Sequence, residues 1–167
     1  MPEEKPAVPE TKPAGKAKLV VRIVLFAILI VVLITAILHA NLRRRYKKAI
    51  GIYDEAVRIL NRSDQAQRIA KFKEAEAILE SVCESPLSAI KIREPANKSL
   101  AQIKMQLGVD RGMSDRTLEG YTDAVEFLRR AHELDPESRQ IAARLKEYEG
   151  YLKRMQENSP PPARPQE

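Results

Sequence analysis

YTDAVEFL, residues 121–128, is a short pattern that the chain nearly repeats at 53–60 (YDEAVRIL) and at 72–79 (FKEAEAIL). In each copy an alanine follows the aromatic residue by three positions, and a leucine follows that alanine by four. Spacings of three and four residues place these side chains on one stripe of an α-helix. The pattern therefore predicts helices that pack along this stripe.

The second and third copies can be aligned beyond eight residues. Aligning Phe72 with Tyr121 pairs Val82 with Ala131 and places Pro86 one position before the equivalent of Pro136. Small side chains let a neighbouring helix approach closely, and a proline disfavours continuation of the helix. The first copy lacks this extension and is interpreted as a simple packing helix.

The third copy, Tyr121-x-x-Ala124-x-x-x-Leu128-x-x-Ala131-x-x-x-x-Pro136, resembles the second helix of a tetratricopeptide repeat. The second copy matches more loosely, because a valine stands in an alanine position and the proline comes one residue early. The copies lie 49 residues apart, whereas the family's repeat has 34, and the first helices lack its Trp and Leu-Gly signals.

This resemblance implies a divergent array of two helical hairpins, with residues 137–156 as a capping helix. An unrelated helical bundle is the alternative. The expected repeat core consists of Phe72, Ala75, Leu79, Tyr121, Ala124, Leu128, Ala131 and Pro136.

Residues 19–42 (LVVRIVLFAILIVVLITAILHANL) contain an uncharged run from Ile23 to Leu38. Together with Ala40 and Leu42 this run reaches the ~20 residues that a helix needs to cross ~30 Å of hydrocarbon. A cleaved secretory signal has a shorter apolar region of about 7–15 residues, and a buried core helix would need an apolar partner that the rest of the chain lacks. One transmembrane helix is therefore predicted.

Five cations follow the span within residues 43–48, and we expect them to contact anionic lipid head groups, at about 1 kcal/mol each. They are Arg43, Arg44, Arg45, Lys47 and Lys48. Residues 49–167 carry 19 basic and 20 acidic residues, so the chain's net charge of +6 does not indicate nucleic-acid binding. The dense cluster favours a cytoplasmic C-terminal domain on an inner or plasma membrane.

The rest of the chain divides by composition. Residues 1–18 and 158–167 are proline-rich and predicted to be disordered tails. Between them, residues 49–157 have helical periodicity, and breaks rich in Pro, Gly, Asn and Ser predict about five helices. The expected helices are 45–61, 66–84, 95–107, 117–134 and 137–156. The first can continue the membrane helix without a break. The expected fold class is all-α.

The polar residues do not form a pattern that indicates catalysis. Cys83 is the single cysteine, and His39 and His132 stand 93 residues apart. There is no Gly-rich phosphate loop, no paired-cysteine metal spacing and no nucleophile motif with a nearby base. The sequence thus predicts neither an enzyme nor a metal, cofactor or small-molecule substrate.

A helical hairpin array offers a concave surface that receives peptides or helices of other proteins. In the helix at 95–107, an apolar stripe is expected to face the core, whereas Asn97, Ala101 and Lys104 share another face and are the predicted partner-binding residues. The chain is thus predicted to be a single-pass membrane scaffold that recruits other proteins. The alternative is a structural subunit, permanently packed within a membrane complex or homo-oligomer.

Overall fold

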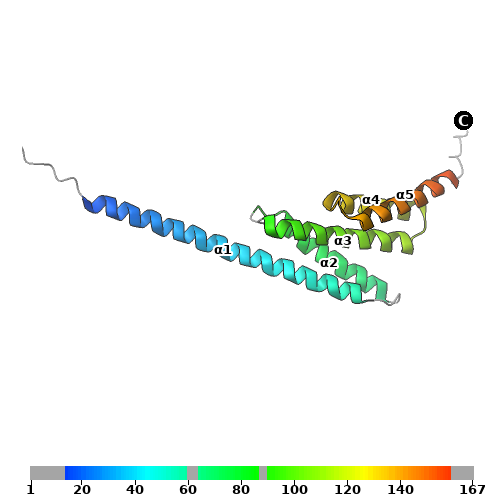
Figure 1. Ribbon diagram of the computed structural model, residues 1–167. Coiled ribbons are helices and arrows are strands. Elements are labelled where there is room, and N and C mark those ends of the chain that lie inside the picture. The colour runs from blue at the N-terminus through cyan, green and yellow to red at the C-terminus, as the bar shows by residue number, and fades with distance from the viewer. Residues whose placement is uncertain (1–13, 60–63, 87–89, 159–167) are drawn as a thin grey trace, which may run out of the picture. The chain divides into compact units, whose positions relative to one another are not determined.

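The computed structural model describes residues 14–59, 64–86 and 90–158, and its regular elements there are all α-helices (Figure 1). The five helices are α1 (Ala14–Arg58), α2 (Gln65–Cys83), α3 (Ile90–Ser114), α4 (Leu118–Leu134) and α5 (Arg139–Asn158). The predicted all-α class is confirmed for this part of the chain. The predicted tails lie outside it, except that α1 already begins at Ala14 and α5 ends at Asn158.

The chain divides into two compact units, Met1–Leu38 and His39–Glu167, and α1 contributes residues to both. In the described part of the first unit, the large apolar side chains are exposed, Phe26 at 65% for example. A core helix buries such side chains, so their exposure fits the predicted membrane span better. Among the described residues, one helix is long and apolar enough to cross a membrane. The hydroxyl of Thr35 donates a hydrogen bond to the Val31 carbonyl at 2.8 Å. This polar group therefore has its hydrogen-bond partner within the helix.

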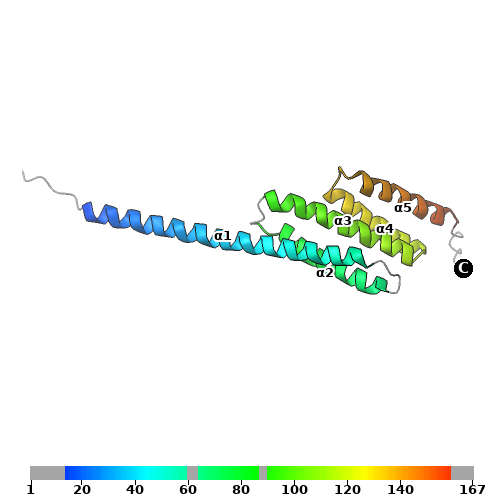
Figure 2. The ribbon, with the colours of Figure 1, turned by 60° about the horizontal axis from the view of Figure 1, so that its bottom comes forward.

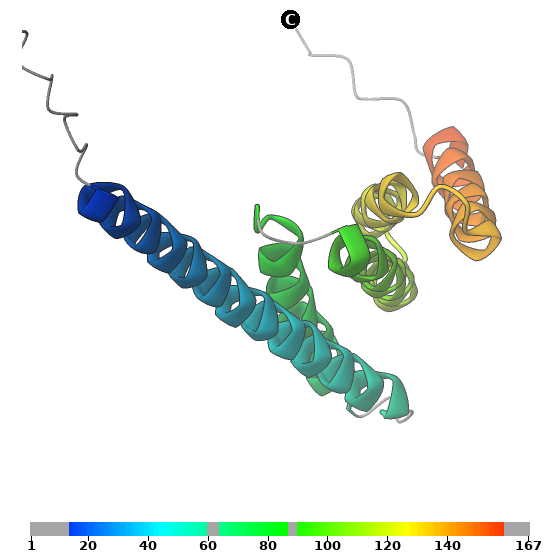
Figure 3. The same cartoon turned by 60° about the vertical axis from the view of Figure 1, so that its left-hand side comes forward.

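The second unit has two hydrophobic cores that meet at α3. The first core joins α1, α2 and α3, and the second core joins α3, α4 and α5. Helix α3 contacts both α2 and α4, and α4 contacts α5 (Figures 2 and 3). The first core includes Ala49, Phe72, Ala75, Leu79, Leu100 and Ile103. The second core includes Ala101, Met105, Ala124, Leu128, Ala131 and Ile141.

Helix α1 enters the first core without a break after the apolar run, as expected for a membrane helix that continues into the domain. Leu42 and Ala49 are buried, and the half-buried Tyr46 packs against the same core. The compact unit therefore starts at His39, ahead of residue 49, where the helical domain was predicted to begin. The cationic segment 43–48 is part of the first helix of this unit.

Helix α3 is longer at both ends than the predicted helix at 95–107. At its start, Pro95 was expected to begin the helix but lies inside it. The backbone hydrogen bond that Pro95 cannot make is the one to the carbonyl of Lys91, an exposed residue near the helix start where water can replace it. The proline is therefore tolerated one turn after the helix begins.

At the other end of α3, Gly108 and Gly112 were expected to stop the helix but instead allow α4 and Tyr148 of α5 to approach. A Cβ atom on Gly108 would lie 3.0 Å from the Ala124 carbonyl oxygen, and one on Gly112 would lie 2.3 Å from Cε1 of Tyr148. Glycine permits such backbone contacts because it has no side chain. Ala124 is fully buried at this crossing, as predicted.

Helix α4 begins with a hydrogen-bonded cap. The side chain of Thr117 accepts a hydrogen bond from the backbone N–H of Gly120 at 3.2 Å, and its own hydroxyl donates to Asp115 at 2.7 Å. Such a cap satisfies one of the free N–H groups at a helix start. The cap therefore fixes the residue at which α4 begins after the end of α3.

Candidate functional site

Two ion-pair clusters hold α2 against α3. The ammonium group of Lys104 donates to Glu76 at 2.5 Å and to Glu80 at 2.9 Å, and only 7% of Lys104 is exposed. Burial alone would lower the pKa of Lys104, but the hydrogen bonds to the two carboxylates outweigh it, and the pKa is raised. Lys104 is therefore a charged residue of the α2–α3 contact.

The predicted recognition face of α3 is not open to a partner. The ammonium group of Lys104 is paired with carboxylates of α2, and Ala101 is fully buried in the second core. Asn97 is half-buried. The expectation that these three residues form an exposed binding face is wrong, because α3 has a neighbouring helix on two sides.

The second ion-pair cluster lies further along the same contact. Arg68 of α2 pairs with Asp110 of α3, of which 3% is exposed. Burial raises the pKa of Asp110, and the nearby Arg68 opposes this rise without cancelling it. The remaining atoms Arg68 Nε and Asp110 Oδ2 are buried and have no hydrogen-bond partner among the described residues. The pair thus fixes the register of the two helices at an electrostatic cost.

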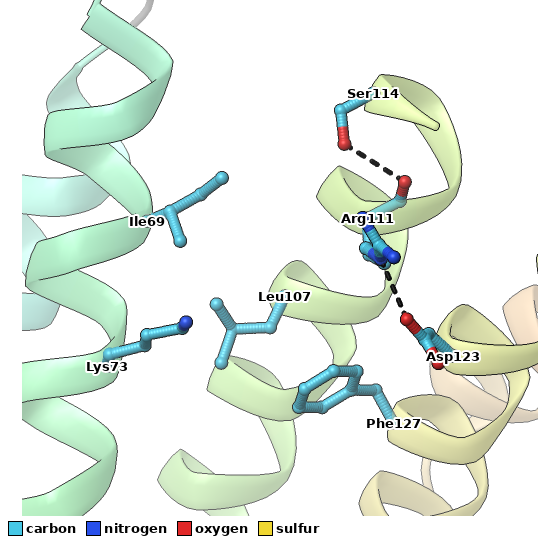
Figure 4. A pocket seen from close by; sticks show the side chains of 7 residues that line it. All are labelled: Ile69, Lys73, Leu107, Arg111, Ser114, Asp123 and Phe127. Atoms are coloured by element: carbon cyan, nitrogen blue, oxygen red, sulfur yellow. Dashed lines mark hydrogen bonds and ion pairs between the residues drawn. The ribbon is translucent and has the colours of Figure 1, made fainter. Parts of the chain in front are cut away.

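A groove between α2, α3 and α4 lies beside these contacts (Figure 4). Its volume is about 380 Å³. A second hollow of about 310 Å³ along α4 shares Asp123 and Phe127 with it. We call this site the α2–α4 groove; it is lined by Ile69, Lys73, Leu107, Arg111, Ser114, Asp123 and Phe127.

The α2–α4 groove combines an apolar floor with a charged rim. Its apolar side chains come from three helices: Ile69 from α2, Leu107 from α3 and Phe127 from α4 (Figure 4). Lys73 extends from α2 toward Leu107, and it makes no ion pair within the described residues. Such a surface can hold an apolar side chain and, beside it, a carboxylate.

The opposite rim of the groove is already neutralised. Arg111 Nε donates to Asp123 at 2.9 Å, and its guanidinium lies 3.3 Å from Asp115. The hydrogen bond to Asp123 raises the pKa of Arg111. Lys73 therefore carries the uncompensated charge among the groove's lining residues.

The other predicted residues divide between surface and core. The five juxtamembrane cations are exposed, and Lys48 also lies 3.8 Å from Glu74 of α2. Most of the expected repeat core is buried: Phe72, Ala75 and Leu79 in α2, and Ala124, Leu128 and Ala131 in α4. Tyr121 is half-buried and Pro136 is exposed.

The sequence alone did not indicate the α2–α4 groove. Its lining residues come from three helices, and none of the intervals between Ile69, Leu107 and Phe127 follows a helical period that would reveal them as neighbours. The one available signal is the pair of cations Lys73 and Arg111, exposed and half-buried respectively, near apolar positions. Such a signal is common on helix surfaces.

The described residues contain no group of three or more His, Cys, Asp or Glu side chains that could hold a metal ion. Cys83 is half-buried, and burial raises the pKa of its thiol. The thiol is therefore held in its less reactive, protonated form.

No family model matches the chain, and no curated protein or solved structure is significantly similar to it. The arguments for function consequently rest on the residues and contacts of this chain.

Proposed function

We propose that this protein is a single-pass membrane scaffold whose helical domain recruits a partner protein through the α2–α4 groove. The groove carries the proposal, because it joins an apolar floor to an unpaired cation, Lys73, at an exposed position. The segment that fits is one with an apolar side chain next to an acidic one.

The helical domain is proposed to be a divergent tetratricopeptide-like array. In support, α2 and α4 bury equivalent stripes, Ala75 and Leu79 in one and Ala124 and Leu128 in the other. The order of contacts also supports an array, since α2 packs on α3, α3 on α4, α4 on α5, and α3 also reaches α5. Repeat proteins stack neighbouring helices in this sequential way.

The membrane anchor is proposed to be the apolar part of α1, with the exposed cations at 43–48 touching anionic lipid. An inner or plasma membrane, with the domain on the cytoplasmic side, fits the position of these charges. The helical domain would follow the anchor directly along the chain, since the first core begins at Leu42.

The first experiment separates this proposal from a permanently packed subunit. A fragment of residues 39–158 contains both cores and lacks the apolar run. A recruiting domain with its groove open should be soluble and monomeric in sedimentation at micromolar concentration. Self-association of this fragment would favour the structural subunit.

The second experiment tests the groove. Proteins crosslinked in native membranes would be purified with the wild-type chain, with Lys73→Glu and with a matched control, Lys146→Glu, on the exposed side of α5. Reversing the Lys73 charge should lower the yield of the groove partner about tenfold, a factor that corresponds to about 1.4 kcal/mol. Equal yields from all three chains would show that the groove is not the recruiting surface.

A further inference from the structure

The α2–α4 groove runs along the helices that form it. Residues three, four or seven positions apart lie on one stripe of a helix. The residues that line the groove and its adjoining hollow include such stripes on each helix: Ile69 and Lys73 on α2, Leu107, Arg111 and Ser114 on α3, and Asp123, Phe127 and Arg130 on α4 (Figure 4). Each stripe follows its helix axis, and the one on α4 extends over about 10 Å.

The polar side chains on the α3 and α4 sides of the groove are already used within the domain. Arg111 donates to Asp123 at 2.9 Å, and the hydroxyl of Ser114 donates to the Arg111 carbonyl at 3.0 Å. In the adjoining hollow, Arg130 is paired with Glu126. These two sides therefore offer few free hydrogen-bonding groups to the backbone of a bound segment.

A helix suits such a groove because its backbone groups are already paired with one another. An extended segment would place unpaired N–H and C=O groups against the apolar floor, and burying such groups without a partner costs free energy. Extended segments bind instead where a sheet edge supplies these hydrogen bonds, and the described residues contain no strand. The lining of the groove therefore favours an amphipathic helix.

Helix α3 has one side between α2 and α4 on which a further helix can lie. Among the described residues, α2 and α4 each pack against α3 but not against each other. Ile69 on α2 and Phe127 on α4 are half-buried, so each has apolar surface left for a partner, and both point toward the groove in Figure 4. A helix laid along α3 at this place would contact all three helices, as neighbouring helices of a bundle do.

The charges of the groove specify one edge of such a helix. Lys73 stands on the α2 wall at an exposed position, and it makes no ion pair in the described part of the chain. The charges at the other wall cancel in pairs, Arg111 with Asp123 and Arg130 with Glu126. An acidic residue of the partner is therefore favoured beside α2 and not beside α4.

We propose that the partner segment held in the α2–α4 groove is an amphipathic α-helix of at least two turns, with an acidic residue paired to Lys73. Its apolar residues recur at intervals of three and four, because these positions share the stripe that faces α3. This inference rests on the proposed recruiting function, and it names the class of partner that the groove takes.

Photo-crosslinking from two groove positions measures the conformation of the bound segment. Benzoylphenylalanine would replace Asp123 in one full-length chain and Arg130 in another, both in native membranes, and mass spectrometry would identify the crosslinked partner residues. The two positions are seven residues apart on α4, or about 10 Å along its axis. A bound helix should be crosslinked at positions about seven residues apart, whereas an extended segment would be crosslinked about three residues apart.

The outcomes separate this inference from the function on which it rests. A separation of about three residues would overturn the helix but leave the groove as the recruiting surface. The matched control has the same crosslinker at Lys146, on the exposed side of α5. If the two groove positions capture no partner, or only the partner residues that the control also captures, both proposals fail. Circular dichroism of each chain in nanodiscs checks that the substitutions leave the helix content unchanged.

A peptide that spans the crosslinked segment supplies the second readout, titrated against the full chain in nanodiscs. Proline at a solvent-facing position in its middle should weaken binding at least tenfold, whereas alanine at the same position should change it little, because proline disrupts a helix interior. Equal binding of the two peptides would overturn the helix. Exchanging the acidic residue of the peptide for lysine should weaken binding to the wild-type chain and restore it to Lys73→Glu. Without this restoration the pairing with Lys73 is wrong.

Discussion

The ammonium group of Lys104 lies within 2.9 Å of two α2 carboxylates, Glu76 and Glu80, at the largely buried contact of two helices. Lys104→Met keeps most of the side-chain volume but leaves these acids facing each other without a cation. We expect the free energy of unfolding to fall by about 1–3 kcal/mol in urea denaturation of fragment 39–158. Lys98→Met, which removes the exposed i,i+4 pair with Glu94, is the control and should change little.

Lys104 should also make the stability of the domain depend on pH in the alkaline range. The pKa of Lys104 is raised in the folded protein above its ordinary value of 10.5. Its stabilising contribution is therefore complete below pH 10.5 and is lost as the pH rises through the folded-state pKa. Burial raises the pKa of Tyr148 as well, which adds to the alkaline loss. Denaturation measured from pH 9 to 12 should thus show a shallower decline in Lys104→Met than in the wild type, and parallel curves would contradict this assignment.

At the scale of elements, the packing of α5 against α3 depends on one glycine of α3. In Gly112→Ala the new methyl group would lie 2.3 Å from the ring of the buried Tyr148, so the ring or the helix must move. Overpacking costs about 1–3 kcal/mol, whereas alanine gains about 1 kcal/mol in helix propensity, and we expect a net loss of stability. The melting temperature of fragment 39–158 measures the difference.

Gly150→Ala is the matched control, because it also lies inside a helix but has nothing within 4 Å of the new methyl group. It should gain stability by up to about 1 kcal/mol. The two substitutions are therefore expected to shift the melting temperature in opposite directions. A rise in both variants would mean that α5 does not approach α3 closely at Gly112.

The sequence predicts each helix better than it predicts which faces of that helix are covered. The stripes of α2 and α4 could be read from spacing, because each helix buries mainly one side. Helix α3 buries two sides, so the polar Lys104 and the small Ala101 were mistaken for a solvent face. Gly112 was mistaken for a stop signal, because periodicity does not show that a neighbouring helix needs the space.

At the scale of the whole molecule, the helical domain should need residues ahead of 49. Leu42 is 7% exposed and packs in the first core, together with Tyr46. Burying a leucine stabilises a protein by about 1.5–3 kcal/mol. Fragment 39–158 should therefore be more stable than fragment 49–158 by at least this amount in urea denaturation. Equal stabilities would mean that the domain begins after the cationic segment.

The side of the membrane on which the domain lies follows from the charges that flank the apolar run. The C-terminal flank has five cations within residues 43–48, whereas the N-terminal flank has four spread over residues 12–22. Because positive flanks are retained in the cytoplasm, we expect the helical domain to be cytoplasmic. The probe is a single cysteine, Lys146→Cys in a Cys83→Ala chain, at an exposed position of α5.

An impermeant maleimide should label this cysteine only after the cells are made permeable. Ala7→Cys in the same background is the control for the other side and should react in intact cells. Labelling of Lys146→Cys in intact cells, with protection of Ala7→Cys, would reverse the topology. The groove with Lys73 would then face the exterior, and its acidic partner would have to be a secreted, periplasmic or cell-surface protein.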